Sequence, residues 1–380
     1  MSRYLILLLP LCVLTSCAKN YDSINFGSGS STPYVYDWDK IADTGTNALM
    51  SGYWNASGSY FNANNQGNTG FNYWPQAHGL DILVDASMRT DSSTYTNYMA
   101  SWYTGVQALN GGTFIGQYYD DMGWNALAML RAYDVTKNDQ WKTASQAVWV
   151  NIQGGWNTIE GGGIAWQKQE LYNKGTPANG NACILAARMY EHFSDPADLA
   201  WAQKIYNWEK STLVDPGTGF VYDGINENND GVLNTTWFFT YNQGLFIGAA
   251  LELFNATGQQ SYLSDAILTA NNAITDPRII SNGLLHDEGQ GDGGLFKGVL
   301  VRYLTQLTLC KSIDANTQGR YVAFLKTNAQ SLWLKATTRP GYFYGSNWSV
   351  PPSGETDLTT DESGAILFEA MALLAKNKLL

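Results

Sequence analysis

Two adjacent aspartates, Asp120 and Asp121, are the residues of this chain that most clearly suggest chemistry. They lie between Tyr118-Tyr119 and Gly123-Trp124, immediately before an apolar helical stretch. Neighbouring carboxylates repel each other, and aromatic side chains that exclude water make their ionised forms more costly. That arrangement adds little stability, whereas an enzyme that cleaves glycosidic bonds needs two carboxyl groups in different protonation states. We expect catalysis here, although the dipole of a helix N-terminus also favours aspartates for structural reasons alone.

The spacing of the pair bears on the type of reaction. Glycosidases that work by double displacement hold their carboxyl groups about 5–5.5 Å apart, which adjacent residues can reach. An inverting enzyme needs about 6.5–9.5 Å and therefore a second carboxylate elsewhere in the chain. Asp81, Glu160 and Asp292 are the candidates for that more distant partner.

Apolar residues with a helical period dominate the chain and must position this pair. The pattern predicts about twelve amphipathic helices. Strand-like alternation is confined to short pieces such as residues 219–222. The helices are expected approximately at 35–54, 73–89, 93–109, 120–135, 138–152, 178–193, 196–212, 240–255, 260–274, 294–311, 315–335 and 360–377.

The connections between these helices alternate in length. Short polar loops alternate with long loops rich in glycine and aromatic residues, at 154–179, 215–240, 276–294 and 339–359. A closed ring of helical hairpins gives this alternation, with the long loops forming a cleft on one face. We therefore predict an all-α fold, an (α/α)6 barrel. A helical solenoid is the alternative, but no repeat of fixed length is visible.

Composition limits the classes of partner. The 380 residues include 22 basic and 33 acidic side chains, for a formal charge of −11. No basic patch is available to meet phosphates, which argues against nucleic acid and anionic lipid. Aromatic residues reach 13% and charged residues only 14%, a balance that suits a neutral sugar stacked on rings.

The N-terminus has the pattern of a secretory signal. A short positive start and an apolar run precede Leu14 to Cys17, which resembles the lipobox of bacterial lipoproteins. We expect a signal peptide at 1–16, a flexible tether at 17–33 after a lipidated Cys17, and one catalytic domain at 34–380. The lipid on Cys17 would be the only membrane attachment and would place the protein in the bacterial cell envelope, periplasmic or surface-exposed.

The sequence favours no metal and no cofactor. Oxygen-bearing residues alternate from Asn226 to Gly231 as in a calcium loop, but the twelfth position is Trp237, where an EF-hand needs glutamate. The three histidines form no spaced ligand set. Cys183 and Cys310 lie in apolar helical patterns and are expected to be free thiols, with a disulfide as the alternative.

The run from Tyr119 to Trp124 resembles the signature of glycoside hydrolase family 76, the bacterial endo-α-1,6-mannanases. The resemblance covers the chain from about residue 35 in the family's order, and the paired aspartate is intact. The other matching stretches are Tyr73-Trp74-Pro75-Gln76-Ala77-His78, Gly161-Gly162-Gly163-Ile164-Ala165-Trp166, Thr176-Pro177-Ala178-Asn179-Gly180, Thr240-Tyr241-Asn242-Gln243-Gly244, Phe296-Lys297-Gly298 and Val301-Arg302-Tyr303.

This resemblance implies an (α/α)6 barrel that hydrolyses α-1,6-mannosidic bonds in mannan with retention of configuration. It implies that Asp120 is the nucleophile and Asp121 the general acid and base. We expect a monomer that binds an α-mannan oligo- or polysaccharide. The residues expected to bind the sugar are Trp74, His78, Tyr119, Trp124, Gly162, Trp166, Asn179, Tyr241, Asn242 and Asp292.

Two other functions fit the same features. A transglycosidase acting on the same linkage would pass through the same glycosyl-aspartate intermediate and transfer it to a sugar hydroxyl. A non-catalytic surface glycan-binding lipoprotein would share the anchor and the aromatic residues but would have no need of paired carboxylates in a pocket.

Overall fold

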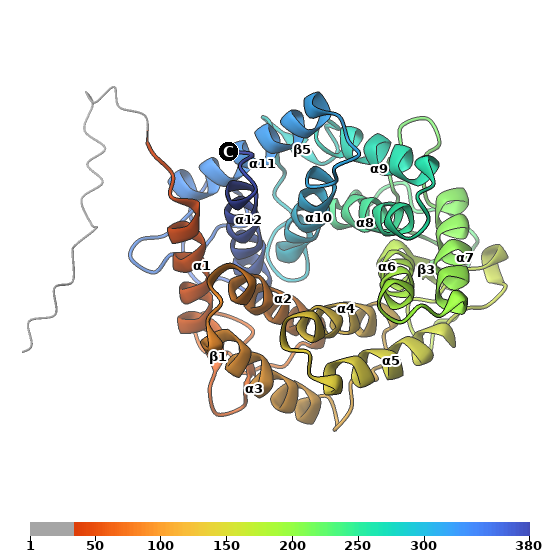
Figure 1. Ribbon diagram of the computed structural model, residues 1–380, viewed down its shortest axis with the longest axis horizontal. Helices are drawn as coiled ribbons and strands as arrows, with labels where there is room; N and C mark the ends of the chain where they lie inside the picture. Colours follow the sequence, from red (N-terminus) through yellow and green to blue (C-terminus); the bar gives the residue numbers. More distant parts are fainter. Residues whose placement is uncertain (1–33) are drawn as a thin grey trace, which may run out of the picture. The chain divides into compact units, whose positions relative to one another are not determined.

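Twelve α-helices in two concentric rings make up most of the computed structural model, which describes residues 34–380 (Figure 1). Residues 36–380 form one unit. The inner ring consists of α2 (Tyr73–Thr90), α4 (Tyr119–Thr136), α6 (Thr176–Phe193), α8 (Thr240–Thr257), α10 (Gly293–Thr308) and α12 (Leu358–Lys376). The outer ring consists of α1 (Trp38–Tyr53), α3 (Ser93–Leu109), α5 (Asp139–Gln153), α7 (Pro196–Thr212), α9 (Gln260–Ala273) and α11 (Ala315–Lys335).

Contacts between successive inner helices close the ring. Each inner helix packs against the next, and α12 packs against α2. The predicted all-α (α/α)6 barrel is therefore confirmed. The predicted signal peptide at 1–16 and tether at 17–33, with Cys17, lie outside the described residues.

The inner helices are buried on every side and are not amphipathic as predicted. All residues from Thr240 to Leu253 of α8 are buried, as are all residues from Leu358 to Ala372 of α12. An outer helix such as α3 buries one stripe, with Tyr95, Met99 and Trp102 along it. A helix that contacts protein all round shows no single apolar stripe, whereas an outer helix needs only one buried face.

Glycines allow the inner helices to approach closely. A Cβ atom at Gly180 of α6 would lie 2.7 Å from Leu245 Cβ of α8. At Gly244 of α8 it would lie 2.7 Å from the Cα atom of Leu300 in α10. Both distances are shorter than a van der Waals contact, so no larger residue fits without moving a neighbouring helix.

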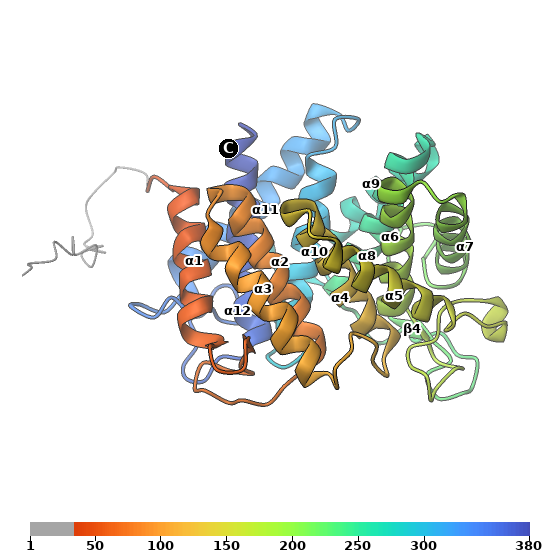
Figure 2. The same ribbon diagram turned by 60° about the horizontal axis from the view of Figure 1, so that its bottom comes forward.

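The helix starts differ between the two rings. Five of the six outer helices, all but α9, begin at local side-chain caps, for example Ser92 Oγ, which accepts from Thr94 N at 3.3 Å, and Asp195 Oδ1, which accepts from Ala197 N at 2.9 Å. None of the six inner helices has a side-chain cap at its N-terminus. All six begin where a long loop ends, so their N-termini gather at one end of the barrel (Figure 2).

The long loops contain only short strands. Three antiparallel pairs of two residues each are present: β1 (Trp54–Asn55) with β2 (Tyr60–Phe61), β3 (Lys174–Gly175) with β4 (Gly224–Ile225), and β5 (Ile280–Ser281) with β6 (Leu284–Leu285). In the register of β3 and β4, Gly175 is opposite Gly224, which ties the loop before α6 to the loop before α8. Among the described residues, no helix is long and apolar enough to cross a membrane.

We expect Gly105→Ala in α3 to destabilise the protein by about 2–3 kcal/mol. The new Cβ atom would lie 2.3 Å from the carbonyl oxygens of Gly58 and Ser59, and backbone cannot move aside as a flexible side chain can. Gly319→Ala in α11 is the matched control, because nothing lies within 4 Å of its Cβ position. Relief of the helix-propensity cost should stabilise that variant by about 0.5–1 kcal/mol. Thermal unfolding should give shifts of opposite sign, and equal melting temperatures would contradict this account of the packing.

Candidate active site

The aspartate pair lies in the first turn of α4. Tyr119 begins the helix and its backbone N–H donates to the Trp166 carbonyl oxygen at 2.9 Å. Asp120 is 9% exposed and accepts two hydrogen bonds, from the Asp121 backbone N–H to Oδ1 at 2.8 Å and from Trp166 Nε1 to Oδ2 at 3.0 Å. One residue from another loop therefore fixes both the helix start and the orientation of the Asp120 carboxylate.

The surroundings raise the proton affinity of both carboxyl groups. Burial raises the pKa of Asp120 to about 7; its two N–H donors act in the opposite direction, and Asp223 adds to the rise. The pKa of Asp121 rises well above its ordinary value because of burial, then the charge of Asp120, then that of Asp292. Donors on the Asp120 oxygens favour its ionised form, whereas Asp121 has two carboxylates acting on it. Asp120 thus ionises first and Asp121 keeps its proton longer.

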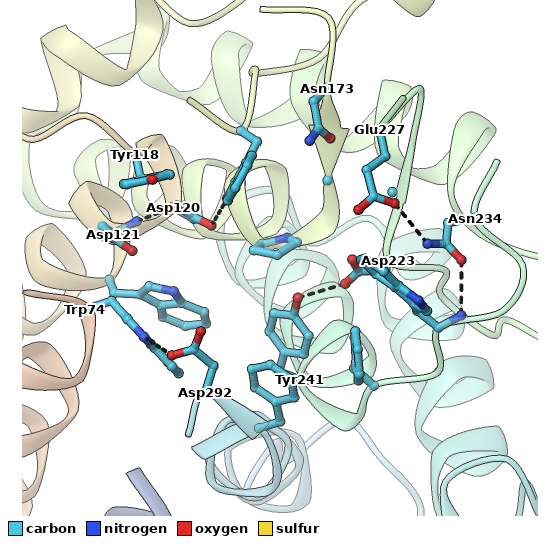
Figure 3. Close-up of a pocket in the computed structure, with 18 of the residues that line it drawn as sticks. Trp74, Tyr118, Asp120, Asp121, Asn173, Asp223, Glu227, Asn234, Tyr241 and Asp292 are labelled. Carbon is cyan, nitrogen blue, oxygen red and sulfur yellow. Dashed lines mark hydrogen bonds between the residues drawn. The ribbon is translucent and has the colours of Figure 1, made fainter. Parts of the chain in front are cut away.

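A cleft of about 510 Å³ opens beside the pair (Figure 3). Its walls combine aromatic rings with carboxyl and amide groups. The lining residues are Asn72, Trp74, Tyr118, Asp120, Asp121, Trp124, Trp166, Asn173, Gly175, Pro177, Asp223, Gly224, Glu227, Asn234, Trp237, Phe239, Tyr241, Asp292 and Phe296.

Three further carboxylates face this cleft, each with a hydrogen-bond donor. Asp223 accepts from Tyr241 Oη at 2.7 Å and from Asn242 Nδ2 at 3.0 Å. Asp292 accepts from Trp74 Nε1 at 2.9 Å. Glu227 accepts from Asn234 Nδ2 at 3.3 Å. Figure 3 shows Asp223 and Glu227 across the cleft from Asp120 and Asp121.

Half of the residues expected to bind sugar line the cleft: Trp74, Trp124, Trp166, Tyr241 and Asp292. Together they come from α2, α4, α8 and two long loops. Sequence separation between them reaches more than two hundred residues, and only the closed ring brings them together.

The other five expected residues do not line the cleft. Each of them packs against or hydrogen-bonds to other parts of the protein. His78 is 2% exposed beneath the rings of Trp74 and Trp124, with ring centroids at 5.6 and 4.9 Å. Burial lowers the pKa of His78 to about 3, so this ring is neutral. It packs against the two tryptophans and does not line the cleft.

Asn179 and Asn242 have similar supporting positions. Asn179 is fully buried, donates to the carbonyls of Ile164 and Gly175, and accepts from Ile164 N at 2.7 Å. It thereby fixes the segment that leads to Trp166. Asn242 is fully buried and holds Asp223.

Tyr119 and Gly162 are packing positions. Tyr119 is 5% exposed, and a Cβ at Gly155 would lie 2.9 Å from its ring. Gly162 is buried, with a φ of +153°, and a Cβ there would lie 2.8 Å from both Trp156 and Trp208. Gly162 therefore leaves room for two tryptophan rings, and it does not line the cleft.

Sequence reasoning missed several lining residues, including Tyr118, Asp223, Glu227, Trp237 and Phe296. Tyr118 is adjacent to the aspartate pair, and Phe296 lies in a stretch that resembles the family. Asp223, Glu227 and Trp237 lie in the long loop before α8, whose length and aromatic content were the only signal.

Of the three carboxylates considered as the distant partner in an inverting mechanism, one lines the cleft and two do not. Asp81 does not line the cleft and forms an ion pair with Arg131. Glu160 does not line it either. Asp292 does, next to Trp74.

No group of three or more His, Cys, Asp or Glu side chains within residues 34–380 is arranged to hold a metal ion. In the calcium-like loop at residues 226–231, Asn226 Oδ1 accepts a hydrogen bond from Gly231 N at 2.7 Å. Asp230 Oδ1 accepts one from Val232 N at 3.0 Å. These oxygens close a turn. Cys183 and Cys310 are both free thiols.

Known proteins are similar to this chain in sequence and in fold. The model of glycosyl hydrolase family 76 matches residues 37–379. Mannan endo-1,6-alpha-mannosidase DCW1 of Candida glabrata is 27% identical over 307 residues, which cover 73% of this chain and 67% of that protein. DCW1 of Saccharomyces cerevisiae is 26% identical over 302 residues, 73% of this chain and 66% of that protein. The chain thus spans about two thirds of the length of these relatives.

Solved structures are more similar. The GH76A alpha-1,6-mannanase from Salegentibacter sp. HEL1_6 is 41% identical with a TM-score of 0.87, over 89% of this chain and 100% of that one. An inactive variant of that enzyme with two aspartates replaced by alanine, in complex with alpha-1,6-mannotetrose, is 40% identical with the same TM-score and coverage. The Lin0763 protein from Listeria innocua is 35% identical with a TM-score of 0.84, over 90% of this chain and 99% of that one.

The family model matches nearly the whole of the described chain. The chain belongs to glycosyl hydrolase family 76.

Proposed function

We propose that this protein hydrolyses α-1,6-mannosidic bonds within mannan, as a monomer and with retention of configuration. The observation that carries the proposal is the Asp120 carboxylate, held by two N–H donors beside a carboxyl group that keeps its proton. The substrate follows from similarity to an α-1,6-mannanase that is 40% identical over 89% of this chain and whose inactive variants bind α-1,6-mannotetrose and α-1,6-mannotriose.

In the first step Asp120 attacks the anomeric carbon of a mannose unit. A carbon–oxygen bond forms to Asp120 as the bond to the departing 6-oxygen breaks, and Asp121 gives its proton to that oxygen. Gain of this proton lets the leaving group depart as a neutral hydroxyl and leaves Asp121 as a carboxylate. The product of this step is a mannosyl ester of Asp120.

In the second step the ester is hydrolysed. Esterified Asp120 no longer has a negative charge, so the proton affinity of Asp121 falls and its carboxylate can accept a proton. Asp121 takes that proton from a water molecule that attacks the anomeric carbon. The bond to Asp120 breaks, and two inversions leave the original configuration.

The cleft walls suit a neutral sugar chain. The rings of Trp74, Trp124 and Tyr241 offer faces for the C–H surfaces of mannose. The carboxylates of Asp223 and Asp292 have lone pairs beyond their present hydrogen bonds with which to accept sugar hydroxyls. Burial of such hydroxyls against charged acceptors gives stronger hydrogen bonds than neutral pairs do.

Replacing either aspartate of the pair should reduce cleavage of linear α-1,6-mannan by about 10³-fold or more, because nucleophile and acid/base are each needed in both steps. Release of reducing ends by Asp120→Ala and Asp121→Ala measures this. On a mannoside with an activated leaving group, azide should rescue Asp121→Ala and give a mannosyl azide of retained configuration. With Asp120→Ala the azide product should be inverted. Cleavage by either variant at the parent rate, or transfer products in place of hydrolysis, would contradict the proposal.

Trp166→Phe should move the acidic limb of the pH profile of kcat/KM to higher pH. The acidic limb reports ionisation of Asp120, whose pKa is about 7. The Trp166 N–H stabilises the ionised form, so removal of that donor raises the pKa of Asp120 further. The rate at the optimum should fall about tenfold. Trp124→Phe is the matched control, because it removes an indole from the same cleft and leaves the Trp166 N–H in place; an acidic limb that moves equally in both variants would rule out this role.

We also propose that the mature protein is anchored in the bacterial cell envelope by a lipid on Cys17. The support is the short basic start, the apolar run and the cysteine that follows it.

Cys17→Ala should shift the protein from the membrane fraction to the soluble fraction, because the lipid is the proposed attachment. Fractionation and lipid labelling of cells that express the full chain measure this shift. Unchanged membrane association of Cys17→Ala would exclude the anchor.

A further inference from the structure

The charge of the cleft is one-sided. Five carboxyl groups line it, on Asp120, Asp121, Asp223, Glu227 and Asp292, and no lysine, arginine or histidine does within the described residues. Aromatic rings fill much of the remaining wall, and such rings lower the local dielectric and strengthen the effect of charge. Even with a proton on Asp121, four other carboxyl groups and no cationic side chain line the cleft within the described residues.

The lysines nearest in sequence to the lining residues do not compensate this charge. Lys174 is fully buried and its ammonium donates to the Gly163 carbonyl oxygen at 2.7 Å. Lys297 is fully buried, with its ammonium 5.7 Å from the centre of the Trp348 ring. Neither side chain reaches the cleft.

The helix N-termini at this end of the barrel would otherwise attract anions. Protein groups already occupy them: Asp120 accepts from Asp121 N in α4, and Glu288 accepts from the backbone N–H of Thr240 at the start of α8, at 2.9 Å. The backbone N–H of Thr176 at the start of α6 donates to the Asp223 carbonyl oxygen at 2.8 Å. These three N–H groups are therefore not available to a phosphate on the substrate.

Glu227 is one carboxylate of this set that lies away from the reactive pair. It follows β4 in the loop before α8, across the cleft from the aspartate pair, and accepts a hydrogen bond from Asn234 (Figure 3). Its charge also acts on Asp223. It therefore contributes to the charge of the substrate path without taking part in bond cleavage.

We propose that the acidic cleft selects mannan by charge: it rejects mannose units with phosphate or other anionic substituents and accepts neutral or amine-bearing ones, with Glu227 as a specificity-determining residue. This inference rests on the proposed mannanase activity. Like charges in a low-dielectric cleft repel, and the binding energy lost to that repulsion is lost for the transition state as well.

The test uses three α-1,6-mannotetraoses that differ only at C6 of the non-reducing mannose, with a hydroxyl, a phosphate or an amine. We expect kcat/KM for the phosphate compound to be about tenfold or more below that for the hydroxyl compound, and the amine compound to equal or exceed the latter. Raising the salt from about 0.05 M to about 1 M should narrow the gap, since screening shortens the reach of the carboxylates.

Glu227→Gln should narrow the gap between the phosphate and hydroxyl compounds at low salt. Asp139→Asn is the matched control, because it removes the same charge from an exposed residue at the first position of α5 and should leave the ratio of the two rates unchanged. A ratio that Glu227→Gln and Asp139→Asn change equally would overturn the role of Glu227.

The outcomes separate this inference from the proposed function. Equal rates for the three compounds, with the neutral one cleaved well, would overturn the charge selection and leave the mannanase activity intact. No cleavage of the neutral compound would overturn the mannanase proposal and the selection that rests on it.

Discussion

Close packing of six helices around a common axis is the constraint on which the rest of this structure depends. Each inner helix has neighbours on both sides, an outer helix behind it and the axis in front, so it has almost no exposed face. Glycines such as Gly180 and Gly244 allow backbones to approach where a Cβ would collide. The apolar and small residues that fill these helices are a consequence of that geometry.

The same packing exposes the inner helix N-termini to the long loops and leaves their backbone N–H groups without local caps. Buried N–H groups need partners. The loops supply these partners. The Trp166 carbonyl oxygen accepts from the backbone N–H of Tyr119, and the Asp223 carbonyl oxygen accepts from that of Thr176. The Glu288 carboxylate accepts from the backbone N–H of Thr240. The bonds that satisfy the helix ends are therefore the bonds that place Trp166 and Asp223 at the cleft.

The reactive carboxylates oppose folding. Burial raises the pKa of Asp120 from 3.8 to about 7, which corresponds to about 4 kcal/mol against its ionised form. Because the folded pKa is above the unfolded one, this cost is absent below the unfolded value and grows until the pH exceeds about 7. The stability of the barrel offsets a cost that the chemistry requires, since a solvated pair of aspartates would both be ionised at neutral pH.

The sequence by itself determined the twelve helices, their alternation of short and long loops, and the aspartate pair, because helical periodicity and glycine-rich loops are local properties. The predicted starts at 178 and 360 lie two residues inside α6 and α12, which begin at Thr176 and Leu358, and the predicted start at 35 lies three residues before the outer helix α1, which begins at Trp38. The N–H partners at the starts of α6 and α12 come from distant loops, so no local cap marks where these helices begin.

Only the tertiary structure decided which polar residues face the cleft. His78, Asn179 and Asn242 lie in stretches that resemble the family yet support the walls, whereas Glu227 joins the cleft from a loop with no periodic pattern. Whether a residue faces the cleft depends on which loop packs over which helix end. The loops take these positions only when the ring of helices closes.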